Sequence, residues 1–136
     1  MKRLACVLSV LALVVASGLA GAQDENSPTI KVVMQKLHKG ANSPLAKLKT
    51  ALKSNSPDWK SIQDSSKDFV ILGASLSKND PPQGEKANYK KLAEAYYANA
   101  KAMDDAARAK NKQACQTAFQ KVSTSCMACH KAHRPS

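Results

Sequence analysis

Apolar residues recur three and four positions apart along most of the chain after residue 27, which is the spacing of one face of an α-helix. Strict alternation of polar and apolar residues, the pattern of a half-buried strand, never persists. Four main amphipathic segments with short connections therefore predict an all-α chain that folds as an antiparallel four-helix bundle. The longest segment covers about 85–109 and follows the clearest loop, residues 79–84.

Local signals predict where the helices begin. The first is expected to start at residues 27–28, and residues 40–44 interrupt it with either a kink or a short loop. Ser56 is expected to cap the next helix, with Pro57 at its first helical position. Asn111 is expected to cap the last helix.

The beginning of the chain predicts export. A short basic start precedes an apolar run over residues 4–15, and residues 20–22 form a small-residue cleavage pattern. We therefore divide the chain into a secretory signal peptide, 1–22, and one domain, 23–136. Removal of the peptide lowers the formal net charge from +11 to +9. No later stretch approaches the roughly 20 apolar residues of a membrane span, so we expect a soluble protein in the periplasm or otherwise outside the cytoplasm.

The residues with distinctive chemistry lie near the C-terminus, where Cys126, Cys129 and His130 form a C-x-x-C-H motif. Spacing of three places both sulfurs on one edge of a helix, where they can add to the two vinyl groups of one haem. The imidazole of His130 then supplies an axial ligand to the iron. One covalent haem c near the C-terminal helix would also complete the interior, because the helix faces are rich in Ala and poor in large apolar residues.

Two other uses of these cysteines are less consistent with the sequence. A redox-active C-x-x-C usually begins a helix beside a strand, whereas this motif ends a helix in an all-helical chain. A zinc site would need the three motif residues and His133, but Cys129 and His130 point about 100° apart on a helix. Cys115 is expected to be a buried free thiol, with an intermolecular disulfide in a homodimer as the alternative.

The motif stands on the last helix of a four-helix chain, and here the sequence resembles the class II c-type cytochromes, the cytochrome c′ family with its low-spin, Met-ligated relatives. The resemblance covers most of residues 23–136 and is strongest over Lys86–Arg134. It implies a haem between the helices with His130 as its proximal iron ligand. Family members usually carry an aromatic residue where His133 stands, followed by an arginine, which implies a place for Arg134 near the proximal side of the haem. We expect His133 to be a surface residue.

The resemblance leaves the sixth iron position open. Low-spin members place a methionine of the first helix there, and Met34 lies in the middle of the first apolar face, so we favour Met34 as the distal ligand. His38 follows one turn later and competes with it, although the break at Gly40 predicts that His38 is solvated at a helix end. Pentacoordinate members leave the position free for NO or CO. Met103 is expected to belong to the core.

These observations predict an exported monohaem c-type cytochrome that transfers electrons through a His/Met-ligated haem and is not an enzyme. The alternative is a pentacoordinate cytochrome c′ that binds NO or CO, and a third hypothesis is a non-haem helical metal-binding or interaction module. The sequence contains no phosphate-binding glycine loop and no clustered carboxylates of a known catalytic motif. The positive charge fits a solvated surface or steering toward an acidic redox partner protein, and export argues against nucleic acid as a partner.

Overall fold

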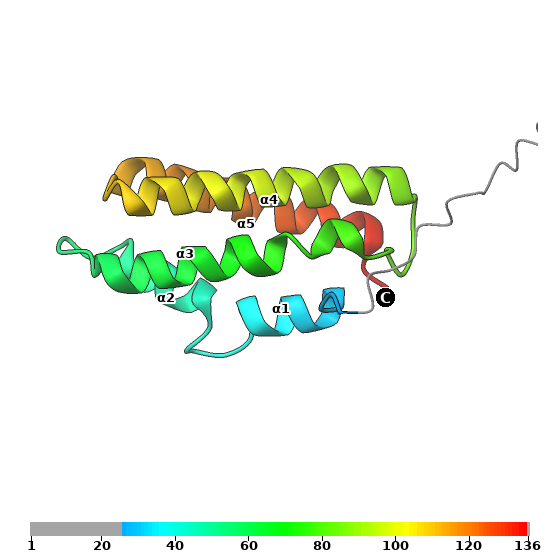
Figure 1. The fold of residues 1–136 in the computed structure, drawn as a ribbon, viewed down its shortest axis with the longest axis horizontal. Coiled ribbons are helices and arrows are strands. Elements are labelled where there is room, and N and C mark those ends of the chain that lie inside the picture. Colours follow the sequence, from blue (N-terminus) through cyan, green and yellow to red (C-terminus); the bar gives the residue numbers. More distant parts are fainter. Residues whose placement is uncertain (1–25, 136) are drawn as a thin grey trace, which may run out of the picture.

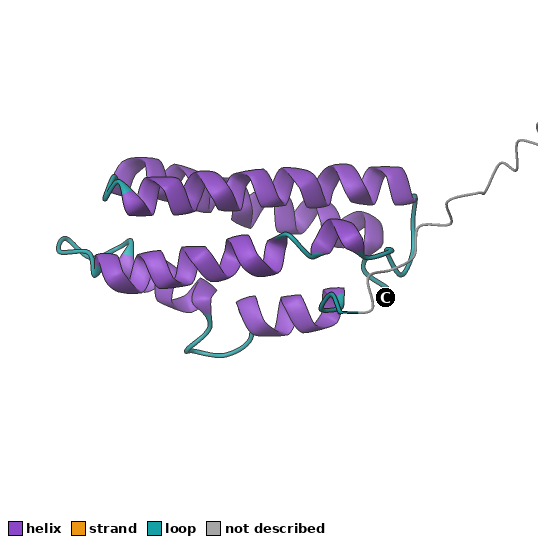
Figure 2. Cartoon of the chain, viewed as in Figure 1, coloured by secondary structure: helices purple, strands orange, loops and turns teal. Residues whose placement is uncertain are grey.

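The computed structural model describes residues 26–135, which form five α-helices, one short 3-10 helix and no strand (Figures 1 and 2). The elements are α1 (Ile30–His38), α2 (Pro44–Ala51), α3 (Trp59–Gly73), η1 (Leu76–Lys78), α4 (Lys86–Arg108) and α5 (Lys112–His133). The all-α prediction is confirmed. The predicted signal peptide, residues 1–22, lies outside the described residues. None of the described helices is long and apolar enough to cross a membrane.

The helices form a bundle of four arms that alternate in direction, with α1 and α2 together making the first arm (Figure 1). Helix α4 packs against both α3 and α5, while α1 and α2 pack against α3. The predicted antiparallel four-helix bundle is therefore confirmed. The interruption in the first arm is a loop, residues 39–43, in which Gly40 has a φ of +93° that favours glycine. Ser43 then caps α2 by accepting a hydrogen bond from the Ala46 amide at 3.3 Å.

Two helix starts differ from the sequence prediction. Helix α1 begins at Ile30, after the 27–28 start that was expected, because the hydroxyl of Thr29 caps it. Helix α3 is capped by Asp58, whose carboxylate accepts a hydrogen bond from the Ser61 amide at 3.2 Å. Ser56 and Pro57 therefore precede the helix, and the prediction of a Ser56 cap was wrong.

The interior combines large apolar side chains from α1 to α3 with a face of α4 on which alanines alternate with larger residues. Ala93, Ala100 and Ala107 lie buried on α4, together with Met103, which confirms Met103 as a core residue. Gly73 of α3 allows a close approach, since a Cβ atom there would lie 3.1 Å from the Cε1 atom of Tyr96. These small residues let the neighbouring helices approach α4 closely.

A buried polar contact joins α3 to α4. Asp104 is 5% exposed and accepts a 2.9 Å hydrogen bond from the hydroxyl of Ser66. Its other carboxylate oxygen lies 2.7 Å from a guanidinium nitrogen of Arg108, one turn along α4. The carboxylate is thus fully paired, so its burial does not leave an uncompensated charge in the core.

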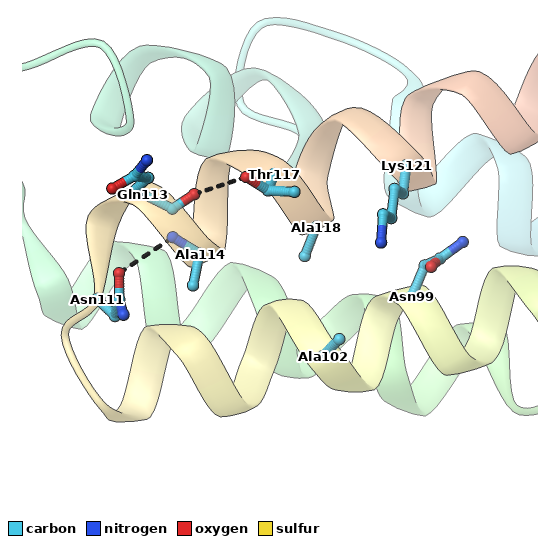
Figure 3. Close-up of a pocket in the computed structure, with 8 residues that line it drawn as sticks. All are labelled: Asn99, Ala102, Asn111, Gln113, Ala114, Thr117, Ala118 and Lys121. Carbon is cyan, nitrogen blue, oxygen red and sulfur yellow. Dashed lines mark hydrogen bonds between the residues drawn. The ribbon is translucent and has the colours of Figure 1, made fainter.

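The turn between α4 and α5 fixes the angle at which the two longest helices meet. The amide of Asn111 donates to the Ala106 carbonyl at 2.9 Å, and the amide of Lys110 donates to the Ala107 carbonyl at 3.1 Å. This pair of bonds is a Schellman motif, which requires a left-handed residue after the helix. Lys110 takes that conformation, with a φ of 54°. Asn111 also caps α5, as predicted, by accepting a 3.0 Å bond from the Ala114 amide (Figure 3).

Replacing Lys110 with Gly is expected to stabilise the fold by about 1 kcal/mol, because a glycine adopts the left-handed conformation without the cost that a side chain imposes. The free energy of unfolding from guanidinium titrations measures the effect. Lys101→Gly, in the exposed interior of α4, is the matched control and should destabilise by about 1 kcal/mol. If both glycines destabilise equally, Lys110 does not hold the left-handed conformation.

Candidate functional site

A small, nearly apolar cavity lies between α1, η1, α4 and α5 and holds about 40 Å³. Its walls bring together four of the six predicted site residues: Met34, Cys126, Cys129 and His130. Met34 comes from α1, and the other three come from the last turns of α5. Two groups of predicted ligands, almost a hundred residues apart in sequence, therefore meet at one place.

The periodicity of α5 places the two thiols at this cavity. Cys115, Val122, Cys126 and Cys129 follow one another three, four or seven residues apart, so they share the inner face of the helix. Cys126 and Cys129 are both half-buried and neither forms a disulfide. The thiol of Cys126 donates to the carbonyl of Val122 at 3.3 Å.

Burial keeps both motif cysteines protonated. It is the main cause that raises the pKa of Cys126 and of Cys129, and the neighbouring Cys129 raises that of Cys126 further. A redox-active C-x-x-C works with a thiolate whose pKa is lowered at a helix N-terminus. Both thiols here stand near the C-terminal end of α5. The environment therefore does not fit the thioredoxin-like alternative.

The two remaining predicted residues, Arg134 and His38, do not line the cavity. Arg134 caps the end of α5, its amide donates to the His130 carbonyl at 3.1 Å, and its side chain is exposed. Its predicted place beside a haem stays a prediction. His130 is exposed overall, although part of its side chain borders the cavity.

His38 is half-buried, so the expectation of a solvated side chain holds only in part. Its ring packs edge-on against Phe69 with the ring centres 5.8 Å apart, and Nε2 is buried without a hydrogen-bond partner. Burial is the main cause that lowers the pKa of His38, and the nearby charge of His130 lowers it further. The helix does end at His38, but Phe69 of α3 covers that end.

His133 is buried as well, with 4% of its surface exposed, and the expectation of a surface residue was wrong. Its Nδ1 atom lies 2.9 Å from the carbonyl oxygen of Gln83, and its Nε2 atom lies 2.9 Å from the side-chain oxygen of Asn88. The ring also packs edge-on against Tyr89, with centres 5.4 Å apart. These contacts, which we call the His133 clamp, tie the end of α5 to the start of α4 and the preceding loop.

A glycine makes the clamp possible. Gly84 has a φ of +81°, and a Cβ atom at this position would lie 2.7 Å from Nδ1 of His133 and 2.8 Å from the Ala132 carbonyl oxygen. Gln83 adds a further bond, because its side-chain amide donates to the Arg134 carbonyl at 2.7 Å. Local sequence gave no sign of the clamp, since its partners lie 45 and 50 residues before His133.

The clamp also removes the fourth ligand of the zinc alternative. Both ring nitrogens of His133 are engaged away from Cys126 and Cys129. Within residues 26–135, no group of three His, Cys, Asp or Glu side chains is arranged to hold a metal ion. A structural zinc site needs four converging ligands, and the described side chains do not provide them.

Cys115 is fully buried, as expected for a free thiol. Its sulfur lies 3.7 Å from the Met103 carbonyl oxygen. Burial and the charge of Asp104 raise its pKa to about 11. An intermolecular disulfide through Cys115 would require α5 to open first, because the sulfur does not reach the surface of this fold.

A larger groove of about 490 Å³ lies on the outer side of α4 and α5 (Figure 3). The residues that line it are Asn99, Ala102, Asn111, Gln113, Ala114, Thr117, Ala118 and Lys121. None of them is a cysteine, histidine or carboxylate, and the Thr117 hydroxyl donates within its own helix to the Gln113 carbonyl. The groove is open, and its lining contains no group of side chains suited to metal binding or catalysis. The smaller cavity is therefore the candidate site.

Comparisons with known proteins support the architecture. No protein-family model and no curated protein matches the sequence. The fold is similar to that in the crystal structure of cytochrome c′ from Thermochromatium tepidum, with a TM-score of 0.57 and 19% sequence identity. The match covers 68% of this chain and 84% of that chain. At this identity the similarity establishes the fold, a four-helix bundle.

Replacing His133 with Ala is expected to destabilise the protein by about 2–4 kcal/mol, because two hydrogen bonds and a buried ring contact are lost together. His133→Phe is the control that keeps a ring against Tyr89 and removes only the hydrogen bonds, so its cost should be smaller. Both effects are measured by guanidinium unfolding. A cost below about 0.5 kcal/mol for His133→Ala is what a surface residue gives and would contradict the clamp.

Proposed function

We propose that this chain is a c-type cytochrome that carries one haem c attached through Cys126 and Cys129, with His130 as the proximal iron ligand. The observation that carries the proposal is the sharing of one apolar cavity by both thiols, His130 and Met34. The C-x-x-C-H spacing and the similarity in fold to a cytochrome c′ support it. We further propose that the protein is exported to the periplasm or an equivalent compartment.

The residues around the cavity fit a porphyrin in character. Leu76, Leu92, Ala93 and Tyr89 present apolar surface, as a macrocycle requires. The space itself is small, since sites for ligands of this size usually hold about 300–1,000 Å³. A haem would therefore require α1 to move away from α5. Helix α1 has only nine residues and ends in the loop containing Gly40, so it is the element that can move.

Unpaired polar atoms give a second sign of fit. The hydroxyl of Tyr96, which borders the cavity, and Nε2 of His38 are the buried side-chain atoms in the described part of the chain that have no hydrogen-bond partner. Buried polar atoms in native proteins are nearly always paired. Both rings contact Phe69, at 6.3 Å for Tyr96 and 5.8 Å for His38. The unpaired atoms thus gather on the side of the bundle where the proposed cofactor belongs.

The proposed activity is electron transfer. A bound haem supplies a one-electron Fe(II)/Fe(III) couple. The thioether of Met34 is a soft donor that favours the ferrous state, so it would raise the reduction potential and exclude small gases. Tyr89 shields the site from water, and its hydroxyl is engaged by the Leu76 carbonyl at 2.9 Å. No residue around the cavity forms a nucleophile–base pair, and we propose that the protein is not an enzyme.

The second candidate function is binding of NO or CO at an open sixth position. The similarity in fold to cytochrome c′ supports this alternative as well as it supports electron transfer. The place of Met34 in the wall that faces α5 favours electron transfer. We propose an acidic redox protein as the partner, since the formal charge of residues 23–136 is +9 and the lysines are mostly exposed.

The covalent attachment predicts that haem stays with the denatured protein during acid–acetone extraction. Replacing Cys126 and Cys129 together by Ala should release it, because both thioether bonds are then absent. Cys115→Ala is the matched control, since that thiol lies outside the cavity and its loss should leave the haem attached. Extraction of haem from the unsubstituted protein would show that the attachment is wrong.

Ligation by Met34 predicts a near-infrared thioether-to-iron charge-transfer band in the ferric protein. Met34→Ala should abolish the band, whereas His38→Ala should keep it. Met127→Ala is the control for loss of a methionine, since Met127 is 70% exposed. If the unsubstituted protein lacks the band and binds CO rapidly, Met34 is a core residue and the gas-binding function takes precedence.

A further inference from the structure

We propose that His38 is a reserve iron ligand, which occupies the sixth position of the haem whenever the thioether of Met34 is absent from it. The inference rests on the proposed function, because it requires a haem held by α5. The new element is that α1 carries two ligands on one face, Met34 and His38. The sixth iron position therefore stays closed to small gases after loss of the Met34 ligand.

The first argument is the state of the His38 ring. Its Nε2 atom is buried and has no hydrogen-bond partner, while the ring is held edge-on by Phe69 at 5.8 Å. A buried nitrogen without a partner is unfavourable, and coordination to iron would satisfy it. Burial and the charge of His130 both favour the neutral imidazole, the form that binds a metal.

The second argument is the repeat along α1. Ile30, Met34 and His38 follow one another four residues apart, so they lie along one face of the helix. Ile30 and Met34 border the cavity, and His38 stands one turn beyond it. Movement of α1 along its axis by four residues, about 6 Å, would bring His38 to the position of Met34. Met34 would take the place of Ile30, which is another apolar residue.

The same shift keeps apolar residues on the buried side of α1. Val33 and Leu37 are the two fully buried residues of this helix, and they are also four positions apart. A one-turn movement replaces Val33 by Leu37, so an apolar side chain still fills that place. Gly40 follows in the loop, and a Cβ atom built there would meet nothing within 4 Å, so the loop has room to adjust. The shifted register therefore keeps an apolar residue in the buried place of Val33, although Leu37 is the larger side chain.

The experiment compares the haem-loaded full-length protein with Met34→Ala, His38→Ala and the double variant. The expected result is that Met34→Ala loses the thioether band but stays low-spin, with the optical and electron paramagnetic resonance spectra of two imidazole ligands. The double variant should be high-spin. If His38 occupies the iron in about nine of ten molecules of the Met34→Ala variant, the apparent affinity of this variant for CO is about tenfold lower than that of the double variant.

Two controls make the result specific. Added imidazole should return the double variant to the spectrum of Met34→Ala, which shows that its haem pocket is intact. Met34→Ala combined with Lys36→Ala should remain low-spin, because Lys36 is an exposed residue of the same helix. A high-spin Met34→Ala protein that binds CO as well as the double variant overturns the inference and leaves the proposed haem site in place. An unsubstituted protein without covalent haem overturns the proposed function itself.

Discussion

The attachment of α5 at both of its ends determines the rest of the site. At one end, the bonds of Lys110 and Asn111 to the last turn of α4 fix the angle between the two helices. At the other end, the His133 clamp bonds α5 to Gln83 and Asn88. The motif cysteines and His130 lie close to the clamp, so α4 and α5 make a fixed wall. Helix α1, which packs on α2 and α3 and is followed by a glycine-containing loop, makes the opposite and more adjustable wall.

Because one wall is fixed and the other is adjustable, the proximal and distal sides of the proposed iron site are held differently. Cys126, Cys129 and His130 stand within five residues of one helix, so their spacing does not change when the cavity opens. The proposed distal side depends instead on the axial position of α1, whose start is tied to the residue after η1 by a 3.1 Å bond from the Asn79 side-chain amide to the Pro28 carbonyl. The proposed proximal ligand thus follows from local sequence, whereas the proposed distal ligand depends on contacts between elements.

The same division explains how much the sequence alone could predict. The helices, the Asn111 cap and the C-x-x-C-H motif follow from neighbours within about one turn, and the structure shows the Asn111 cap and the helices, although α1 and α3 begin later than expected. His38 and His133 were misjudged because their environments come from distant segments. Phe69 covers His38, and Gln83 stands 50 residues before His133. A lone histidine near a helix end carries no local signal of such partners.

The small size of the cavity has a consequence for how a cofactor would be accommodated. The cavity holds about 40 Å³, so a porphyrin would require α1 to give up some of its present apolar contacts and would not enter a preformed pocket. Because the thiols are on the fixed wall, attachment would precede the final placement of α1. In the proposed haem protein, the register of α1 would depend on which side chain of the Ile30, Met34 and His38 face meets the iron. Val33 with Leu37 and Met34 with His38 have the same four-residue spacing, so the proposed movement keeps an apolar residue on the buried side of α1 and a candidate ligand toward the cavity.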